Sequence, residues 1–115
     1  MKGPKPPKAY DQFVARYPKL GEAWNSMADA GRQGPLDEQT CRLVKLAVAI
    51  GALREGAVHS GVRKALATGA SRDEIEQVVA LAAGTIGLPS AVAAYTWLQD
   101  ELGKAPKPAR SRRRA

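Results

Sequence analysis

Apolar side chains recur along the chain at the three- and four-residue spacing of a helix face. The first such stripe occupies positions 10, 13, 14 and 17, which is the i, i+3, i+4, i+7 pattern of one side of an α-helix. Further stripes follow up to Leu102, and residues such as Pro18, Gly31 and Gly103 separate or end them. Alternating, β-branched patterns typical of strands are nearly absent. The sequence therefore predicts an all-α fold, a compact bundle of about six helices.

Several helix ends carry their own signals. Asp37 is a predicted N-cap for a third helix at roughly residues 38–53. Ser71 and Glu74 have the spacing of a capping box, which predicts the start of the fifth helix there. The segment at residues 84–89, GTIGLP, is predicted to be a tight turn before a sixth helix. It lacks the Lys-Ser/Thr ending of a phosphate-binding loop.

The core predicted from these stripes is thin. The third helix contains LVKLAVAIGAL, in which Lys45 is the only charge, so it is expected to be buried within the domain or between subunits. Aromatic residues make up only 5% of the chain, so alanine, which buries little area, must fill much of the interior. Trp24 and Trp97 are interpreted as core or interface anchors. We expect a homo-oligomer in which subunits cover one another's apolar faces.

The net charge of +7 belongs to the two ends of the chain. Residues 9–102 hold 9 basic and 11 acidic side chains, so this part is nearly neutral. We predict three segments: a basic, proline-rich N-terminal arm (1–8), a helical domain (9–102) and a flexible basic C-terminal tail (103–115). The tail has no interleaved aromatic residues, so a specific nucleic-acid partner is not expected.

Composition limits the other partners and cofactors. No apolar run approaches the ~18 residues that span a bilayer, and the N-terminus has no apolar signal segment. We therefore expect a cytoplasmic protein without a membrane partner. The chain has one cysteine and one histidine, which excludes an intramolecular disulfide and a cysteine- or histidine-rich metal site. No metal and no cofactor is predicted.

The best chemical candidate is the line formed by Glu55, His59 and Arg63. These residues are spaced by four, so on a helix they share one face. A carboxylate beside an imidazole favours the charged ring, and such a pair can shuttle protons. The structural interpretation is that Glu55 suits the positive end of the helix and His59 is simply its surface partner. Spacing alone leaves both interpretations open.

Cys41 is a second candidate. It is predicted near the start of the third helix, beside Arg42, where both the helix end and the cation favour a thiolate. A lone cysteine is, however, commonly a small buried apolar residue. The chain has no second thiol to resolve an oxidised sulfur.

The order of these segments is similar to a known family. The stretch PLDEQTCRLVKLAVAIGAL, followed by REGAVHSGVRKALATGAS and DEIEQVV, resembles the carboxymuconolactone decarboxylase-like family, which includes the alkylhydroperoxidase D-like proteins. The resemblance covers about residues 7–102. It implies an all-α fold that assembles into trimers or hexamers.

The residues that perform redox chemistry in this family are replaced in this chain. Redox-active members carry Cys-x-x-Cys-x-x-x-His with an upstream glutamate. In that register Arg54 and Ala57 stand at the two cysteine positions, Gly61 at the histidine and Arg42 at the glutamate. Peroxidase chemistry of this kind needs a thiolate and a resolving thiol, so peroxiredoxin-type activity is disfavoured.

Decarboxylase-type members use a histidine as proton carrier, and here the histidine is displaced. His59 stands two residues before the family's histidine position, which rotates the side chain by ~200° around a helix. His59 therefore acts from another direction, or this chain has lost the activity.

Three functions follow as hypotheses. The first is a decarboxylase-like lyase that performs acid/base chemistry on a small organic acid or lactone through Glu55 and His59. The second is a non-catalytic oligomeric helical protein that keeps the fold without the site. The third, disfavoured, is an antioxidant peroxidase that uses Cys41 with an external reductant.

Overall fold

The computed structural model describes residues 7–105, in which there are six α-helices and no strand. In chain order they are α1 (Lys8–Arg16), α2 (Pro18–Gly31), α3 (Glu38–Gly51), α4 (Glu55–Ala67), α5 (Arg72–Ile86) and α6 (Leu88–Lys104). The prediction of an all-α fold of about six helices is confirmed. Most of the predicted basic arm (1–8) and tail (103–115) lies outside the described residues.

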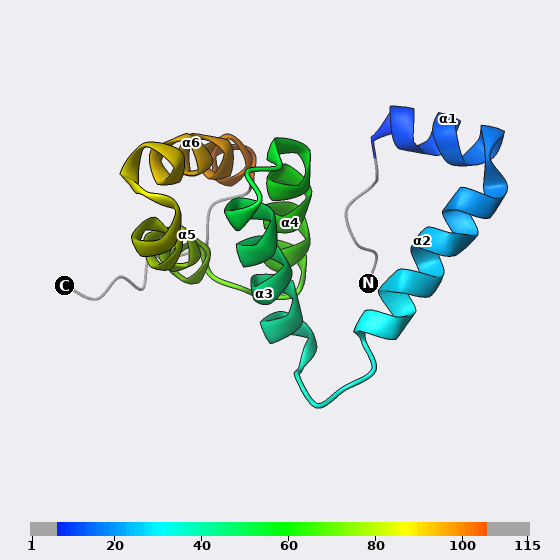
Figure 1. Cartoon of the computed structure of the whole chain (residues 1–115), viewed down its shortest axis with the longest axis horizontal. Coiled ribbons are helices and arrows are strands. Elements are labelled where there is room, and N and C mark those ends of the chain that lie inside the picture. Colours follow the sequence, from blue (N-terminus) through cyan, green and yellow to red (C-terminus); the bar gives the residue numbers. More distant parts are fainter. Residues whose placement is uncertain (1–6, 106–115) are drawn as a thin grey trace.

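Helices α3 to α6 pack around one apolar core (Figure 1). Its buried side chains are small or aliphatic, as the low aromatic content requires. They are Leu46, Ala49, Ile50, Val58, Val62, Ala65, Ala70, Ile75, Val78, Val79, Ala91, Ala94, Leu98 and Leu102. Trp97 packs against this core from its edge.

The α3–α4 pair is closely packed. A Cβ atom added at Gly61 would lie 3.2 Å from Cδ1 of Leu46 and 3.6 Å from its Cα, so α4 approaches α3 almost to backbone contact at this point. The predicted extension of the third helix to residue 53 is wrong by two residues. Leu53 has a φ of 53°, a left-handed conformation that cannot continue a right-handed helix.

Side chains cap α3 and α5 as the sequence predicts. The Thr40 N–H donates to Asp37 Oδ1 over 2.8 Å. The Glu74 N–H donates to Ser71 Oγ over 3.0 Å, and the Ser71 N–H donates to Glu74 Oε1 over 2.8 Å, which completes the capping box.

The turn predicted at residues 84–89 is much shorter in the structure. Residues 84–86 still belong to α5, and α6 begins directly after Gly87. The φ of Gly87 is 90°, a value that favours glycine, so one residue suffices to reverse the chain. At its other end α6 continues through Lys104, one residue past the predicted end.

The first two helices form an N-terminal hairpin, defined here as α1 and α2, that stands apart from the core (Figure 1). Neither helix contains a buried residue. The hairpin packs on itself: the Phe13 and Tyr17 rings lie 5.4 Å apart, and a Cβ atom at Gly21 would lie 3.2 Å from Cβ of Val14. Trp24, predicted as an anchor, remains 47% exposed.

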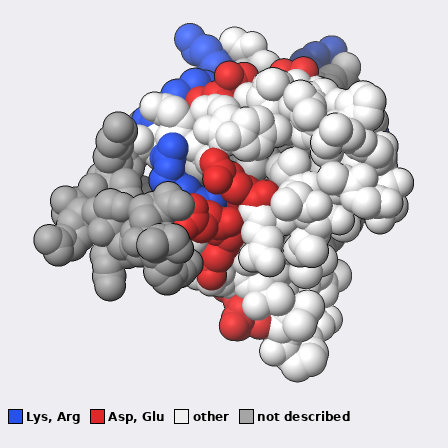
Figure 2. Space-filling model, turned by 90° about the vertical axis from the view of Figure 1, so that its left-hand side faces the viewer, with Lys and Arg blue, Asp and Glu red and all other residues white. Residues whose placement is uncertain are grey.

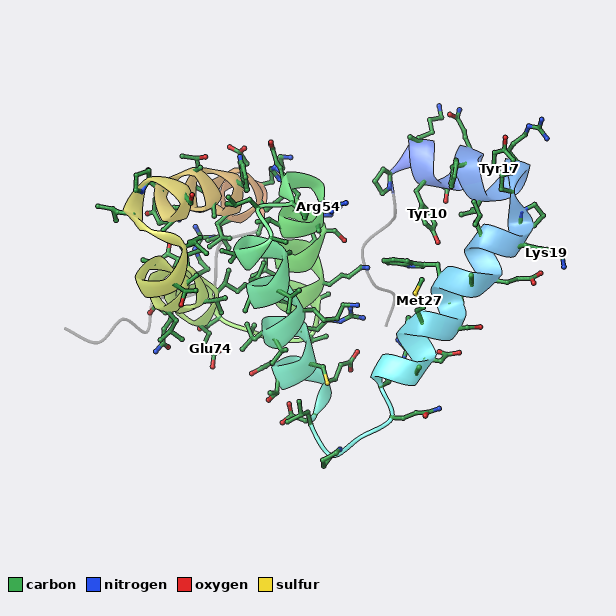
Figure 3. All side chains as sticks on the ribbon, in the orientation of Figure 1. Tyr10, Tyr17, Lys19, Met27, Arg54 and Glu74 are labelled. Atoms are coloured by element: carbon green, nitrogen blue, oxygen red, sulfur yellow. The ribbon has the colours of Figure 1, made fainter. Side chains whose placement is uncertain are left out.

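The ribbons of the N-terminal hairpin and of the α3–α4 pair face each other across a gap (Figure 1). Across it, Nζ of Lys45 lies 6.0 Å from the ring centroid of Trp24, a cation–π contact. Tyr10 and Met27 point toward this space, whereas Lys19 points away from it (Figure 3). The third helix, expected to be buried, is buried on one side only: Val44 and Val48 remain exposed.

The surface formed by α5 and α6 combines charge and apolar area. Figure 2 shows charged side chains gathered in a band on this face, beside a broad uncharged region. Leu81, Leu88, Val92 and Tyr95 are exposed apolar residues of these two helices. Between residues 7 and 105, no helix has both the length and the apolar character that a membrane span requires.

Candidate functional site

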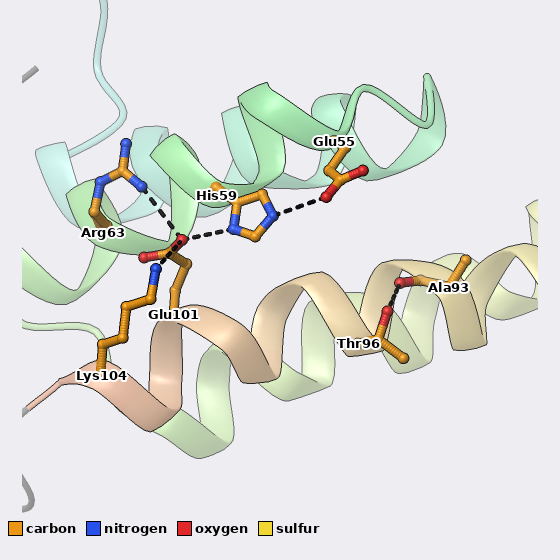
Figure 4. A network of polar contacts seen from close by, with 7 residues as sticks. All are labelled: Glu55, His59, Arg63, Ala93, Thr96, Glu101 and Lys104. Atoms are coloured by element: carbon orange, nitrogen blue, oxygen red, sulfur yellow. Dashed lines mark hydrogen bonds and ion pairs between the residues drawn. The ribbon is translucent and has the colours of Figure 1, made fainter. Parts of the chain in front are cut away.

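The sequence places His59 one turn into α4, and the structure gives both of its ring nitrogens a carboxylate partner (Figure 4). Nδ1 lies 2.6 Å from Oε2 of Glu101, and Nε2 lies 3.2 Å from Oε2 of Glu55. The His59 side chain retains 19% exposure. The imidazole is therefore held at both nitrogens while part of the ring still meets solvent.

Glu101, the buried carboxylate of this cluster, was not predicted from the sequence. It lies on α6, and its side chain is only 4% exposed. A signal was present: on a helix, position 101 falls on the same side as Leu98 and Leu102, both of which are buried. A carboxylate on an apolar stripe needs a partner, because burying an unpaired charge is costly.

Three basic side chains converge on one oxygen of Glu101. Besides His59, Nη1 of Arg63 lies 3.4 Å and Nζ of Lys104 lies 3.6 Å from Oε2 (Figure 4). Arg63 is two-thirds buried and Lys104 is largely exposed. The cluster thereby ties α4 to the end of α6.

Opposing effects set the charge of Glu101. Burial by itself raises the pKa of this carboxyl. The hydrogen bond from His59, the charges of Arg63 and Lys104 and the hydrogen bond from Arg63 together outweigh it, so the pKa lies below the ordinary value of 4.5. Glu101 is consequently a carboxylate at neutral pH, and it accepts the hydrogen bond from Nδ1.

Glu55 occupies the outer side of the imidazole. It is the first residue of α4, and its side chain is 58% exposed. The predicted adjacency of Glu55 and His59 is confirmed. Because Glu55 is in solvent, its side chain is free to rotate away and expose Nε2, whereas the buried Glu101 holds Nδ1 in place. The two carboxylates therefore make the two ring nitrogens unequal.

Cys41 does not join this cluster. Its Sγ lies 3.6 Å from the carbonyl oxygen of Leu36, to which the thiol donates. It stands in the first turn of α3, a segment held beside the end of α4 by the hydrogen bond from Gln39 Nε2 to the Thr68 carbonyl oxygen at 3.4 Å. His59 lies near the opposite end of α4. The two chemical candidates are therefore at different ends of the α3–α4 pair.

Arg42, at the position where redox members of the resembled family carry a glutamate, is one of several cations near Lys64. Burial, followed by the charges of Arg42, Lys45 and Arg63, lowers the pKa of Lys64. Arg42 therefore adds to the positive charge here and provides no proton acceptor. Among residues 7–105, no three His, Cys, Asp or Glu side chains are arranged to hold a metal ion.

Comparison with known proteins agrees with the fold and the motif order. The model of the carboxymuconolactone decarboxylase family matches residues 18–100. The chain belongs to this family. A crystal structure of a carboxymuconolactone decarboxylase family protein from Legionella pneumophila, in its apo form, has the same fold, with a TM-score of 0.74 and 24% identity. The alignment covers 83% of this chain and 86% of that chain. No curated protein matches the sequence.

Membership of the carboxymuconolactone decarboxylase family extends beyond the four-helix core. The match begins at Pro18, the first residue of α2, and it ends at residue 100 within α6. It therefore includes half of the N-terminal hairpin but stops one residue before Glu101. The residue that fixes His59 stands just outside the matched segment.

Proposed function

We propose that this carboxymuconolactone decarboxylase family protein is a lyase-type enzyme that uses His59 as a general acid/base on a small organic acid or lactone. The observation that supports this is the unequal holding of the imidazole. A buried carboxylate, Glu101, fixes Nδ1 at 2.6 Å, and Nε2 faces the exposed Glu55. Histidine gains and loses protons near neutral pH, which suits it to this role.

The roles of the three groups follow from their positions. Glu101 is a positioning residue, because it is buried behind the ring and selects the tautomer with the proton on Nδ1. Nε2 donates to the Glu55 carboxylate when the ring is protonated; once this proton has left and Glu55 has moved aside, Nε2 is the atom that accepts a proton from substrate and later returns it. Glu55, one turn away and exposed, moves aside for substrate or relays that proton to solvent.

The experiment is turnover of a γ-carboxymuconolactone-type lactone by the full chain and its His59→Ala variant. General acid/base catalysis contributes about 10²–10⁴-fold, so the variant should lose at least about 100-fold in kcat. Lys104→Ala is the matched control, since it removes a mostly exposed group from the same cluster and leaves the His59 contacts in place. Equal rates for wild type and His59→Ala would contradict the proposal.

Glu101→Gln separates positioning from chemistry. We expect a smaller loss of kcat than for His59→Ala and a displaced pH–rate profile, because the carboxylate that supports the protonated ring is gone. A purely structural carboxylate would lower stability and leave the pH profile of the folded fraction unchanged. Rates are therefore compared at a temperature at which circular dichroism shows every variant folded.

A second candidate function is a non-catalytic helical protein. It is favoured by the fact that both His59 nitrogens already have protein partners, which is the arrangement of a purely structural ion-pair cluster. This candidate requires His59→Gln to change stability and no activity. Turnover of a defined substrate by the purified protein excludes it.

Peroxidase activity through Cys41 is the least supported candidate. The thiol stands apart from the histidine cluster, and the chain has no resolving cysteine. Alkylation of Cys41 should leave any peroxide consumption by the protein unchanged.

A further inference from the structure

We propose that this chain binds a small phosphate monoester on the side of α3 and α4 that faces the N-terminal hairpin. The phosphate group is held by the cationic cluster, defined as three basic side chains of the two core helices. They are Arg42, Lys45 and Lys64. The organic part of the ligand packs against Trp24 of the hairpin, which Lys45 contacts.

The cationic cluster brings together residues of two helices. Arg42 and Lys45 are one turn apart on α3, and Lys64 belongs to α4. Arg42 and Lys64 are half-buried, whereas Lys45 is exposed. The charges of Arg42 and Lys45 both act on Lys64, so the three cations lie near one another. Arg63 adds a fourth charge, but it is shared with Glu101 at 3.4 Å.

The protein does not balance the charge of this cluster. Within residues 7–105, no carboxylate forms an ion pair with Arg42, Lys45 or Lys64. Burial and the neighbouring cations lower the pKa of Lys64, which means that folding disfavours its charged form. Ionisable groups that are perturbed in this way gather at binding sites, because the ligand supplies the missing charge. An anion bound here would relieve the repulsion.

The number of cations favours a phosphate over a carboxylate. A phosphate monoester carries a charge of about −1.5 to −2 at pH 7 and presents three acceptor oxygens. A carboxylate carries a single charge and would leave most of the cluster unbalanced. The planar guanidinium of Arg42 suits two oxygens of one phosphate, and the ammonium groups of Lys45 and Lys64 act as point charges beside it.

Trp24 provides a surface for the organic part of the ligand. Nζ of Lys45 lies 6.0 Å from the centroid of the Trp24 ring, so the cationic cluster begins beside this ring. The ring is about half exposed, and Met27, which is more exposed still, points toward the same gap (Figure 3). An aromatic group attached to the phosphate can therefore cover Trp24 while the phosphate meets Lys45. Contact between aromatic rings adds affinity that inorganic phosphate lacks.

This inference is independent of the proposed function. The polar partners of His59 and Glu101 are Glu55, Arg63 and Lys104, together with each other, and none of them belongs to the cationic cluster. We therefore expect His59→Ala to bind a phosphate monoester as tightly as the wild type does. Loss of catalysis and loss of phosphate binding are separate outcomes.

The test is isothermal titration calorimetry of the full chain with phenyl phosphate, inorganic phosphate and benzoate. The ionic strength is held constant so that screening is equal. We expect phenyl phosphate to bind most tightly and benzoate least. Lys64→Met keeps the length of the side chain and removes its charge, so it should weaken phenyl phosphate binding at least about tenfold. Lys19→Met is the matched control, because Lys19 points away from the gap (Figure 3).

Trp24→Leu tests the organic part of the ligand separately. It should reduce the affinity for phenyl phosphate toward the affinity for inorganic phosphate and leave the latter unchanged. If the wild type binds the two phosphate compounds equally, Trp24 is not part of the site and the proposal fails in this form.

Thermal unfolding gives a second readout. Without ligand, Lys64→Met should leave Tm unchanged or raise it, because the charges that act on Lys64 are all positive. Phenyl phosphate should raise the Tm of the wild type and of Lys19→Met more than that of Lys64→Met. The proposal is overturned if neither phosphate compound binds, or if benzoate binds as tightly as phenyl phosphate. It is also overturned if Lys19→Met weakens binding as much as Lys64→Met does, since net charge alone would then explain the affinity.

Discussion

The four-helix core and the N-terminal hairpin are built from the same kind of sequence and have opposite surroundings. In α3 to α6 each apolar stripe meets the stripes of neighbouring helices, and residues such as Leu46 and Leu98 are fully buried. In α1 and α2 an equally regular stripe leaves Leu20 and Trp24 about half exposed. An amphipathic pattern thus predicts a helix with one apolar face, but it does not identify the surface that packs against this face.

Two of the core helices also begin differently from the hairpin helices. Asp37 and Ser71 cap α3 and α5 through side-chain hydrogen bonds, whereas Pro7 and Tyr17, which precede α1 and α2, provide none. A side-chain cap satisfies backbone N–H groups that have no partner within the helix. Helices α3 and α5 are therefore favoured by local and tertiary contacts together, whereas α4 and α6, which also lack a side-chain cap, depend on packing in the core.

Truncating one leucine in each region tests directly whether the two regions differ in packing. Leu46→Ala should lower the free energy of unfolding by about 2–5 kcal/mol, because it leaves a cavity in the core. Leu20→Ala should cost about 0.5 kcal/mol or less in dilute solution, as is usual at exposed positions. Urea unfolding followed by circular dichroism measures both. Equal costs in dilute solution would mean that the hairpin packs on its own core.

Local signals in the sequence predicted most of the fold. The helix starts at Asp37 and Ser71 depend on residues within one turn, and the structure confirms both. Two details failed because they depend on backbone dihedral angles that no composition rule specifies. Leu53 adopts a positive φ although it is not glycine, and Gly84 stays helical although glycine is commonly found in turns.

Only the part of the candidate site that lies within one helix could be predicted from the sequence. Glu55 and His59 are neighbours along one helix, so their contact follows from spacing alone. Glu101 reaches His59 from another helix, 42 residues later in the chain, and that contact requires the packing of α4 on α6. A charged residue on the buried stripe of α6 indicates that a partner is needed without identifying it.

Glu101 is a buried charged residue of the four-helix core, so we expect it to contribute more to stability than an exposed charge does. Glu101→Gln should cost about 3 kcal/mol at pH 7, the low end of the range for breaking a buried ion pair. In the folded protein the pKa of the Glu101 carboxyl lies below its ordinary value of 4.5. This stabilisation is therefore complete above about pH 4.5, and it is lost as the pH falls through the pKa of the folded protein.

The wild type and Glu101→Gln should therefore converge in stability in acid. Urea unfolding at pH 7 and again below pH 4 tests this. Glu55→Gln is the matched control, because its carboxyl also contacts His59 but is mostly exposed, and it should cost much less at either pH. A constant difference between wild type and Glu101→Gln across this range would show that the charge of Glu101 is not what stabilises the cluster.

The smallest expected effect concerns the caps that distinguish the two regions. Ser71→Ala removes the acceptor for the Glu74 N–H and should lower the free energy of unfolding by about 1 kcal/mol. Thr96→Ala is the matched control: its hydroxyl donates only to the Ala93 carbonyl within α6 (Figure 4), and alanine is the better helix former there. We therefore expect Thr96→Ala to be neutral or stabilising in the same urea experiment. If both variants lost the same stability, hydroxyl removal in general would account for the loss, and the side-chain cap at Ser71 would not be what stabilises the start of α5.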